Sequence, residues 1–145
     1  MIYADTDFFL ALMKESDWLK EPAERLLRQY SGQIRILPTV LIEMLLLARR
    51  EMLDPERLLS DVLQIGVLEG YDAAVFLKAA KYMKEHNASA LDMLHAASCG
   101  SDDSIISSDK VIDRLGMKRI PLEGQGALTP AENLDAHRVR RFEGQ

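Results

Sequence analysis

The chain has 145 residues and a mass of 16.4 kDa, the usual size of one domain with its own hydrophobic core. Its 48% hydrophobic and 28% charged residues exclude a disordered protein, and a net charge of −5 argues against nucleic-acid binding through overall basicity. A single cysteine, Cys99, excludes an internal disulfide and a cysteine-based zinc site.

Strands are predicted where short apolar segments end at turn residues or prolines, at 1–4, 34–37, 65–68, 104–107 and 118–122. Helices are predicted from helical spacing and caps at 8–13, 18–30, 39–50, 56–63, 72–86, 90–100 and 109–115. This alternation predicts an α/β fold, a three-layer α/β/α sandwich with a small central parallel sheet. Residues 1–122 are expected to form the domain, and 123–145 a C-terminal tail or a peripheral helix.

No apolar run is long enough to span a bilayer, since the richest, 40–48, is short and contains Glu43. The N-terminal segment lacks the basic start and the small-residue cleavage site of a signal peptide. We therefore expect a cytoplasmic protein that makes no membrane contact.

Two acids lie in apolar helical segments. Glu43 lies in a helix that is apolar on nearly all sides, which predicts burial and a need for a cation or an ionic partner. The alternative is an outward Glu43 paired with Arg49 or Arg50. Asp92 repeats the pattern, with a capping-box role behind Ser89 as its alternative. His95 could share a face with Asp92, although a lone histidine is more often structural than a ligand.

Two further acids follow predicted strands. Asp5 comes directly after the first strand, and Asp109 follows the strand at 104–107. In an open parallel sheet, ligands bind beyond the carboxyl ends of the strands where the strand order reverses, so these acids are expected to meet there. Helix capping is the alternative for each. Together, the four acids suit a hard oxygen-ligand site for Mg²⁺ or Mn²⁺.

The motifs resemble, in order, those of the PIN-domain nucleases, and in particular the VapC-type toxin ribonucleases of prokaryotic toxin–antitoxin pairs. They are Tyr3-Ala4-Asp5-Thr6-Asp7, Pro38-Thr39-Val40-Leu41-Ile42-Glu43, Leu91-Asp92-Met93-Leu94-His95-Ala96-Ala97 and Ile105-Ile106-Ser107-Ser108-Asp109-Lys110. The resemblance covers residues 1–122. Asp7 stands where Asn or Ser is more usual, and Ser107 replaces a more frequent Thr.

The resemblance implies a metal-dependent endoribonuclease that cleaves the phosphodiester bonds of RNA with Mg²⁺ or Mn²⁺. The implied metal ligands and catalytic acids are Asp5, Glu43, Asp92 and Asp109, with Ser107 as a supporting hydroxyl and Asp7 and Asp113 as auxiliary acids. It also implies an antitoxin protein partner and a homodimer. A homodimer agrees with the many large apolar groups near the N-terminus, namely Phe8, Phe9, Leu12 and Trp18.

Other functions fit parts of the sequence. A non-catalytic PIN-like module could dock a partner helix or oligomerise through 18–30. The Asp5-Thr6-Asp7 triplet also suggests a haloacid-dehalogenase-type phosphatase with an aspartate nucleophile, but Phe9 and the short chain suit that class poorly. A response-regulator receiver would also place acids at strand ends, but it would not need Glu43.

Overall fold

The computed structural model describes residues 1–124, so nearly all of the predicted tail at 123–145 lies outside the described residues. Five short strands form one sheet in the order β3-β2-β1-β4-β5, and every neighbouring pair is parallel. The strands are β1 (Ile2–Ala4), β2 (Ile34–Ile36), β3 (Val67–Leu68), β4 (Ser104–Ser107) and β5 (Lys118–Pro121). The central strand β1 pairs with β2 on one edge and with β4, about a hundred residues later in the chain, on the other.

Seven helices connect the strands within residues 1–124. They are α1 (Thr6–Met13), α2 (Lys20–Gln29), α3 (Pro38–Arg50), α4 (Pro55–Ile65), α5 (Ala73–Glu85), α6 (Ala90–Ser98) and α7 (Val111–Arg114). Each predicted element is present, and its ends move by up to two residues. The predicted start of α7 moves because the Asp109 carboxylate accepts a hydrogen bond from the Val111 amide, so Asp109 precedes the helix.

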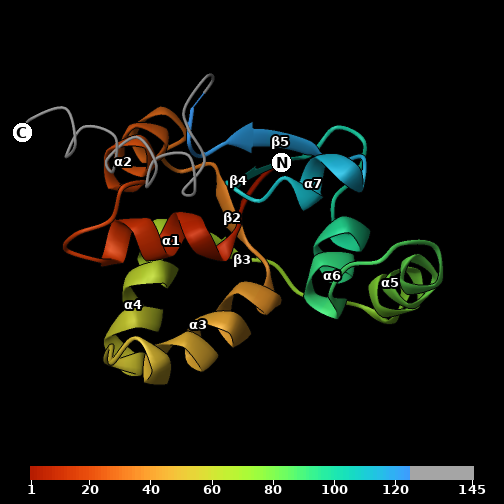
Figure 1. Cartoon of the computed structure of the whole chain (residues 1–145), viewed down its shortest axis with the longest axis horizontal. Helices are drawn as coiled ribbons and strands as arrows, with labels where there is room; N and C mark the ends of the chain where they lie inside the picture. The colour runs from red at the N-terminus through yellow and green to blue at the C-terminus, as the bar shows by residue number, and fades with distance from the viewer. Residues whose placement is uncertain (125–145) are drawn as a thin grey trace, which may run out of the picture.

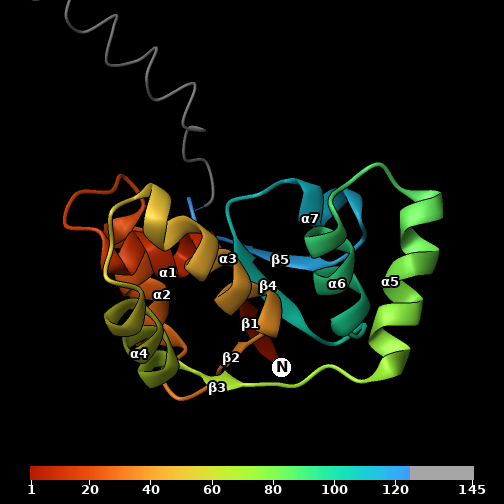
Figure 2. The ribbon, with the colours of Figure 1, turned by 90° about the horizontal axis from the view of Figure 1, so that it is seen from below.

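Helices lie on both faces of the sheet (Figures 1 and 2). Successive side chains of each strand point to opposite faces. Ala4 and Ile106 lie in the core on the side of α1 to α4, packed with Phe8 and Phe9. The intervening residues of the same strands, including Ile105, face the opposite core, whose other members are Tyr3, Leu37, Cys99, Val111 and Ile112. Helix α5 packs on α6 and forms the outer edge of that layer (Figure 2). These layers confirm the predicted three-layer α/β/α sandwich.

Helix α3 differs from the prediction in its burial. Only one face is buried, through Thr39, Val40, Met44 and Ala48, while Ile42, Leu45 and Leu46 are 50%, 51% and 68% exposed. The prediction of burial on all sides was wrong because apolar residues at every helical position cannot all reach a single sheet. Glu43 is therefore partly exposed.

The apolar groups that suggested a homodimer lie mostly inside the protomer. Phe8 and Phe9 are fully buried, with their rings in an edge-to-face contact, and Leu12 is partly buried against the same core. Trp18 is exposed. The homodimer therefore stays a prediction without its original reason. Within residues 1–124, none of the helices is long and apolar enough to cross a membrane.

Candidate active site at the carboxyl edge of the sheet

The site forms where the strand order reverses. From β1 the chain first builds the sheet outward through β2 and β3, and then returns to the other side of β1 with β4 and β5. The strand ends of β1 and β4 therefore lie side by side, and the Asp5 amide donates a hydrogen bond to the Ile106 carbonyl at 2.8 Å. Asp5 and Asp109 were predicted to meet at this position.

Ser107 links these two acids. Its hydroxyl donates to Asp5 Oδ2 at 2.9 Å and accepts from the Asp109 amide at 3.0 Å. The second Asp5 oxygen accepts from the Thr6 amide at the start of α1. Both oxygens of Asp5 are thus fixed by hydrogen bonds, and each still has a lone pair for a further ligand.

Asp7 holds the loop after β4 to the first turn of α1. Its Oδ2 accepts from the amide of Ser108 at 2.7 Å and also from the Ser108 hydroxyl. Its Oδ1 is buried and has no hydrogen-bond partner among the described residues. Asp7 therefore has a structural contact and an unused oxygen beside Asp5.

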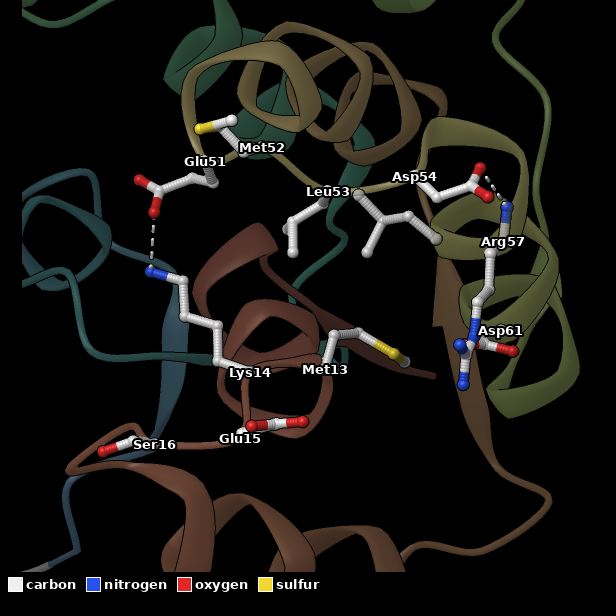
Figure 3. A pocket seen from close by; sticks show the side chains of 11 residues that line it. Met13, Lys14, Glu15, Ser16, Glu51, Met52, Leu53, Asp54, Arg57 and Asp61 are labelled. Carbon is white, nitrogen blue, oxygen red and sulfur yellow. Dashed lines mark hydrogen bonds and ion pairs between the residues drawn. The ribbon is translucent and has the colours of Figure 1, made fainter.

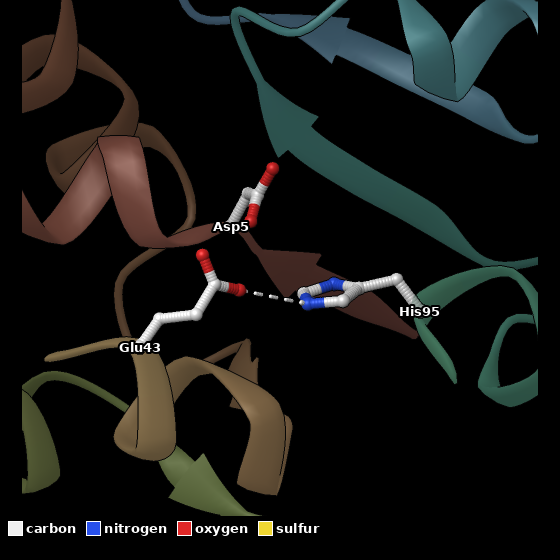
Figure 4. Close-up of side chains that lie close together, drawn as sticks. All are labelled: Asp5, Glu43 and His95. Atoms are coloured by element: carbon white, nitrogen blue, oxygen red, sulfur yellow. Dashed lines mark ion pairs between the residues drawn. The ribbon is translucent and has the colours of Figure 1, made fainter. Parts of the chain in front are cut away.

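Glu43 and His95 complete the site from the other two sequence motifs (Figure 4). One ligand atom from each of Asp5, Glu43 and His95 lies within 4.8 Å of the others. Glu43 Oε1 lies 3.7 Å from His95 Nε2. The three side chains converge from β1, α3 and α6, so this cluster exists only in the folded chain.

Asp5 and Glu43 line a pocket of about 670 Å³. Its polar walls come from Asp5, Asp7, Glu43 and Asp109, and its basic wall is Arg50. Within residues 1–124, none of the four acids forms an ion pair with a lysine or an arginine. These four carboxylates, which include the unpartnered Asp7 Oδ1, suit a divalent cation, which Asp5, Glu43 and Asp109 could bind through oxygen.

Burial shifts the protonation equilibria of the site. It raises the pKa of Asp5 more than the His95 charge and the hydrogen bonds from Thr6 and Ser107 lower it. Burial, reinforced by the charge of Asp5, raises the pKa of Asp7 to about 6. Burial alone would lower the pKa of His95, but the nearby Glu43 and Asp5 carboxylates raise it overall. The acids thus favour a proton or a metal ion between them.

Two predicted site acids lie in other contacts. The Asp92 carboxylate accepts from the Ser89 amide in the capping box of α6, the role that the sequence offered as its alternative. Asp113 forms an ion pair with Arg119 at 2.9 Å. Neither belongs to the three-residue cluster, so their assignment to the site stays a prediction.

His95, Thr39 and Tyr71 form a buried network that the sequence did not predict. The Thr39 hydroxyl lies 2.8 Å from His95 Nε2 and 2.9 Å from the Tyr71 hydroxyl. His95 is 2% exposed, so its polar ring needs such partners. Its spacing of three from Asp92 was one available signal. Nothing in the local sequence indicates Tyr71, since it reaches the network from the loop between β3 and α5.

A second pocket of about 690 Å³ lies between the end of α1 and the turn joining α3 to α4 (Figure 3). It is also lined by four acids, and all of them except the exposed Glu15 have partners. Glu51 lies 3.2 Å from Lys14, and Asp61 lies 3.9 Å from Arg57. Asp54 caps α4 by accepting from the Glu56 and Arg57 amides. Most acids of this pocket are therefore paired with a cation or cap a helix, unlike those of the first.

Several solved structures have a similar fold. DNA-bound VapBC from Salmonella typhimurium is 18% identical over 83% of this chain and 97% of that chain, with a TM-score of 0.64. FitAcB from Neisseria gonorrhoeae is 18% identical over 84% and 98%, also with a TM-score of 0.64. Mycobacterium tuberculosis VapC20, described as a toxin that cleaves the sarcin–ricin loop, is 19% identical over 88% and 97%, with a TM-score of 0.56.

At these identities the likeness establishes the fold alone. None of the curated proteins matches the sequence. The family profile of the PIN domain, however, matches residues 2–118, most of the chain, and it confirms the resemblance that the four motifs indicated. With this match and the parallel sheet that places the acids at its carboxyl edge, the chain belongs to the PIN-domain family.

Proposed function

We propose that this chain is a divalent-metal-dependent endoribonuclease that acts as the toxin of a toxin–antitoxin pair. The observation that carries the proposal is the convergence of Asp5, Glu43 and His95 within 4.8 Å of one another. Asp5 and Glu43 line a pocket whose acids have no lysine or arginine partner in the described part of the chain. PIN domains are generally nucleases, which supports the reaction class.

Each polar residue has a role that its contacts suggest. Asp5, Glu43 and Asp109 would hold Mg²⁺ or Mn²⁺. The bound ion would supply the positive charge that activates water and offsets charge on the phosphate. Ser107 orients Asp5 by donating to Oδ2. Arg50, on the pocket wall, is placed to contact a phosphate of the substrate.

The test is cleavage of a single-stranded RNA by the full chain, with added Mg²⁺ or Mn²⁺ and with a chelator. We expect metal-dependent cleavage that falls about 10²- to 10³-fold in Asp5→Asn, because removing one charge-stabilising group typically costs that much. Asp54→Asn, a helix cap in the other pocket, is the matched control and should cleave at the parental rate. No metal-dependent cleavage by the parent would end the nuclease assignment, and an Asp5→Asn chain as active as the parent would remove Asp5 from the site.

Asp92 and Asp109 need the same measurement. Asp109 lines the pocket and Asp92 caps α6, so the two variants separate ligands from caps. Asp109→Asn should lose metal affinity and cleavage together. If Asp92→Asn keeps full activity, Asp92 is a cap only, since Asn caps helices nearly as well as Asp. A matched loss in Asp92→Asn would instead place it in the site.

The partner is proposed from the structural neighbours, several of which are toxin–antitoxin complexes. A short upstream reading frame encoding a DNA-binding protein would identify the antitoxin. We expect expression of the chain alone to arrest growth, and co-expression of the antitoxin to relieve that arrest. No such relief, with cleavage intact, would leave a ribonuclease without this partner. A non-catalytic module remains the second function, and it is favoured only if no metal binds.

A homodimer is also proposed, through apolar side chains exposed on the outer helices. Ile42, Leu45 and Leu46 on α3 are the largest group of this kind near the pocket. Light scattering at tens of micromolar, about the range in which modest interfaces associate, should give twice the protomer mass. A parental mass of one protomer would contradict the dimer. A Leu45→Glu chain that stays dimeric would place the interface elsewhere.

A further inference from the structure

Arg119 joins three segments of the chain, one of which carries Ser107. It lies on β5, the edge strand beside β4, and only 9% of its side chain is exposed (Figure 1). Its Nε donates to Asp113 Oδ2 on α7 at 2.9 Å, and its Nη1 donates to Glu123 Oε1, just after β5, at 2.8 Å. Nη1 also donates to the main-chain carbonyl of Ser107, at the end of β4, at 3.0 Å.

The bond to the Ser107 carbonyl does more than balance charge. The two carboxylates already neutralise the guanidinium, so this third acceptor is not needed for charge pairing. Arginine presents its N–H donors in a rigid planar fork, so a guanidinium held by two carboxylates also fixes where the carbonyl must lie. The Leu122 amide donates to the same carbonyl at 3.2 Å. A shift of the end of β4 would therefore break both bonds.

Ser107 transmits this constraint to two proposed metal ligands. Its hydroxyl donates to Asp5 Oδ2 at 2.9 Å and accepts from the Asp109 amide at 3.0 Å. Through Asp113, Arg119 also holds α7, whose first amide donates to the Asp109 carboxylate. The segment 107–113, which contains Asp109, is thus fixed at both of its ends by one side chain.

We propose that Arg119 positions the carboxylates of Asp5 and Asp109 through Ser107, and that Asp113 and Glu123 are the counter-charges of Arg119 and not metal ligands. The inference rests on the proposed function and adds a positioning residue to its site. It also gives Asp113, expected from the sequence to be an auxiliary acid of the site, a different role.

The experiment is calorimetric titration of the full chain with Mn²⁺, or with Mg²⁺ if only that ion binds, at a temperature at which circular dichroism shows every variant folded. Ser107→Ala should weaken metal binding by about 10- to 100-fold, the usual cost of losing a group that holds a metal ligand. Arg119→Gln, one contact further out, should lose about 10-fold. In a Ser107→Ala chain, Arg119→Gln should cost less than about twofold more, because the hydroxyl through which it acts is already gone.

Two further variants refine the test. Arg119→Lys serves if Arg119→Gln does not fold, because lysine keeps a positive charge between the two carboxylates. Lysine lacks the planar fork, so metal affinity should still fall by about 3- to 10-fold, again only while the Ser107 hydroxyl is present. Asp113→Asn leaves Arg119 bonded to Ser107 and Glu123, and it should bind metal within about twofold of the parent.

Arg35→Gln is the matched control, since Arg35 on β2 also pairs with an acid, Glu69 at 3.2 Å, that is not part of the site. Its metal affinity should equal that of the parent. Parental affinity in both Arg119 variants, or a loss that is as large without the Ser107 hydroxyl, would overturn the inference and leave the nuclease proposal standing. A loss in Asp113→Asn as large as that in Asp5→Asn would make Asp113 a ligand and overturn its role as counter-charge. If the parent binds neither metal, the proposed function itself fails.

Discussion

Two pockets of nearly equal size, about 670 and 690 Å³, show how differently acids can be used in one small domain. In the pocket at the α3–α4 turn, Glu51 and Asp61 pair with Lys14 and Arg57, and Asp54 caps a helix. In the pocket at the sheet edge, Asp5, Asp7, Glu43 and Asp109 share one basic neighbour on the wall, Arg50.

The comparison shows that the number of acids lining a pocket does not by itself indicate a functional site. Paired carboxylates at a surface cancel charge and gain little stability. Carboxylates held together without cations repel one another, and the fold keeps them so only through other contacts, such as those of Ser107 and Ser108. Such an unpaired group is the stronger indication of a bound cation.

The largest expected contrast is between Glu43→Gln and Glu51→Gln, which remove the same charge near the middle and at the end of α3. Glu43→Gln should reduce RNA cleavage by about 10²- to 10³-fold, because Glu43 lies in the cluster. Glu51→Gln should cleave within about twofold of the parent, as expected for a surface substitution. Single-turnover cleavage rates measure both. Equal losses would show that general charge, and not the cluster, carries the activity.

Asp7 should make the free energy of unfolding of the metal-free chain depend on pH. Its folded pKa of about 6 lies above the ordinary value of 3.8, so the folded state holds the proton more tightly. Stability should fall as pH rises from about 4 to 6, by at most about 3 kcal/mol. The amide side chain in Asp7→Asn has no titratable proton, so this variant should not lose stability over that pH range.

Urea unfolding of the metal-free chain at several pH values measures the Asp7 effect. Asp7→Asn should exceed the parent in stability above pH 6, and the gap should close below about pH 4. Asp72→Asn, an exposed helix cap, controls for general loss of negative charge. A gap between Asp7→Asn and the parent that persists unchanged at low pH would place the cause elsewhere.

Substitution of Met52, in the second pocket, should change stability less than substitution of Asp7. It ends α3 with a φ of 54°, and the Leu53 amide closes the turn on the Ala48 carbonyl at 2.8 Å. Since Met52 is 93% exposed, Met52→Gly should relieve backbone strain with little lost packing and stabilise the chain by about 0.5 to 1 kcal/mol. Thermal unfolding measures the gain. Met52→Ala keeps the Cβ atom and should gain nothing; an equal gain there would rule out the strain.

The smallest expected effect is that of Lys14→Gln, which breaks the partly exposed pair with Glu51. The free energy of unfolding should fall by less than about 1 kcal/mol, and the difference should shrink in 1 M salt. Its metal affinity should equal that of the parent. Denaturant melts at low and high salt, with a metal titration, test the three statements, and a changed metal affinity would show that the two pockets are coupled.

The sequence predicted the element order and the edge of the sheet where Asp5 and Asp109 meet, because these follow from local patterning and parallel topology. The prediction that α3 is buried on all sides was wrong, because a run of apolar residues does not show which face of the helix lacks a packing neighbour. It also did not foresee that Tyr71, far from every acid in the sequence, reaches Thr39. Contacts between distant loops depend on three-dimensional packing, which the local pattern does not record.

The pairing of β1 with β4 has a consequence for synthesis on the ribosome. Asp5 is made among the first residues, but Ser107, which orients it, follows 102 residues later. A nascent chain that ends before β4 lacks the neighbour that fixes β1 on one side, so the proposed metal site cannot close until most of the protein has been translated. A chain truncated before residue 104 should accordingly bind no metal. The proposed nuclease would then become active only after the chain had been synthesised through β4.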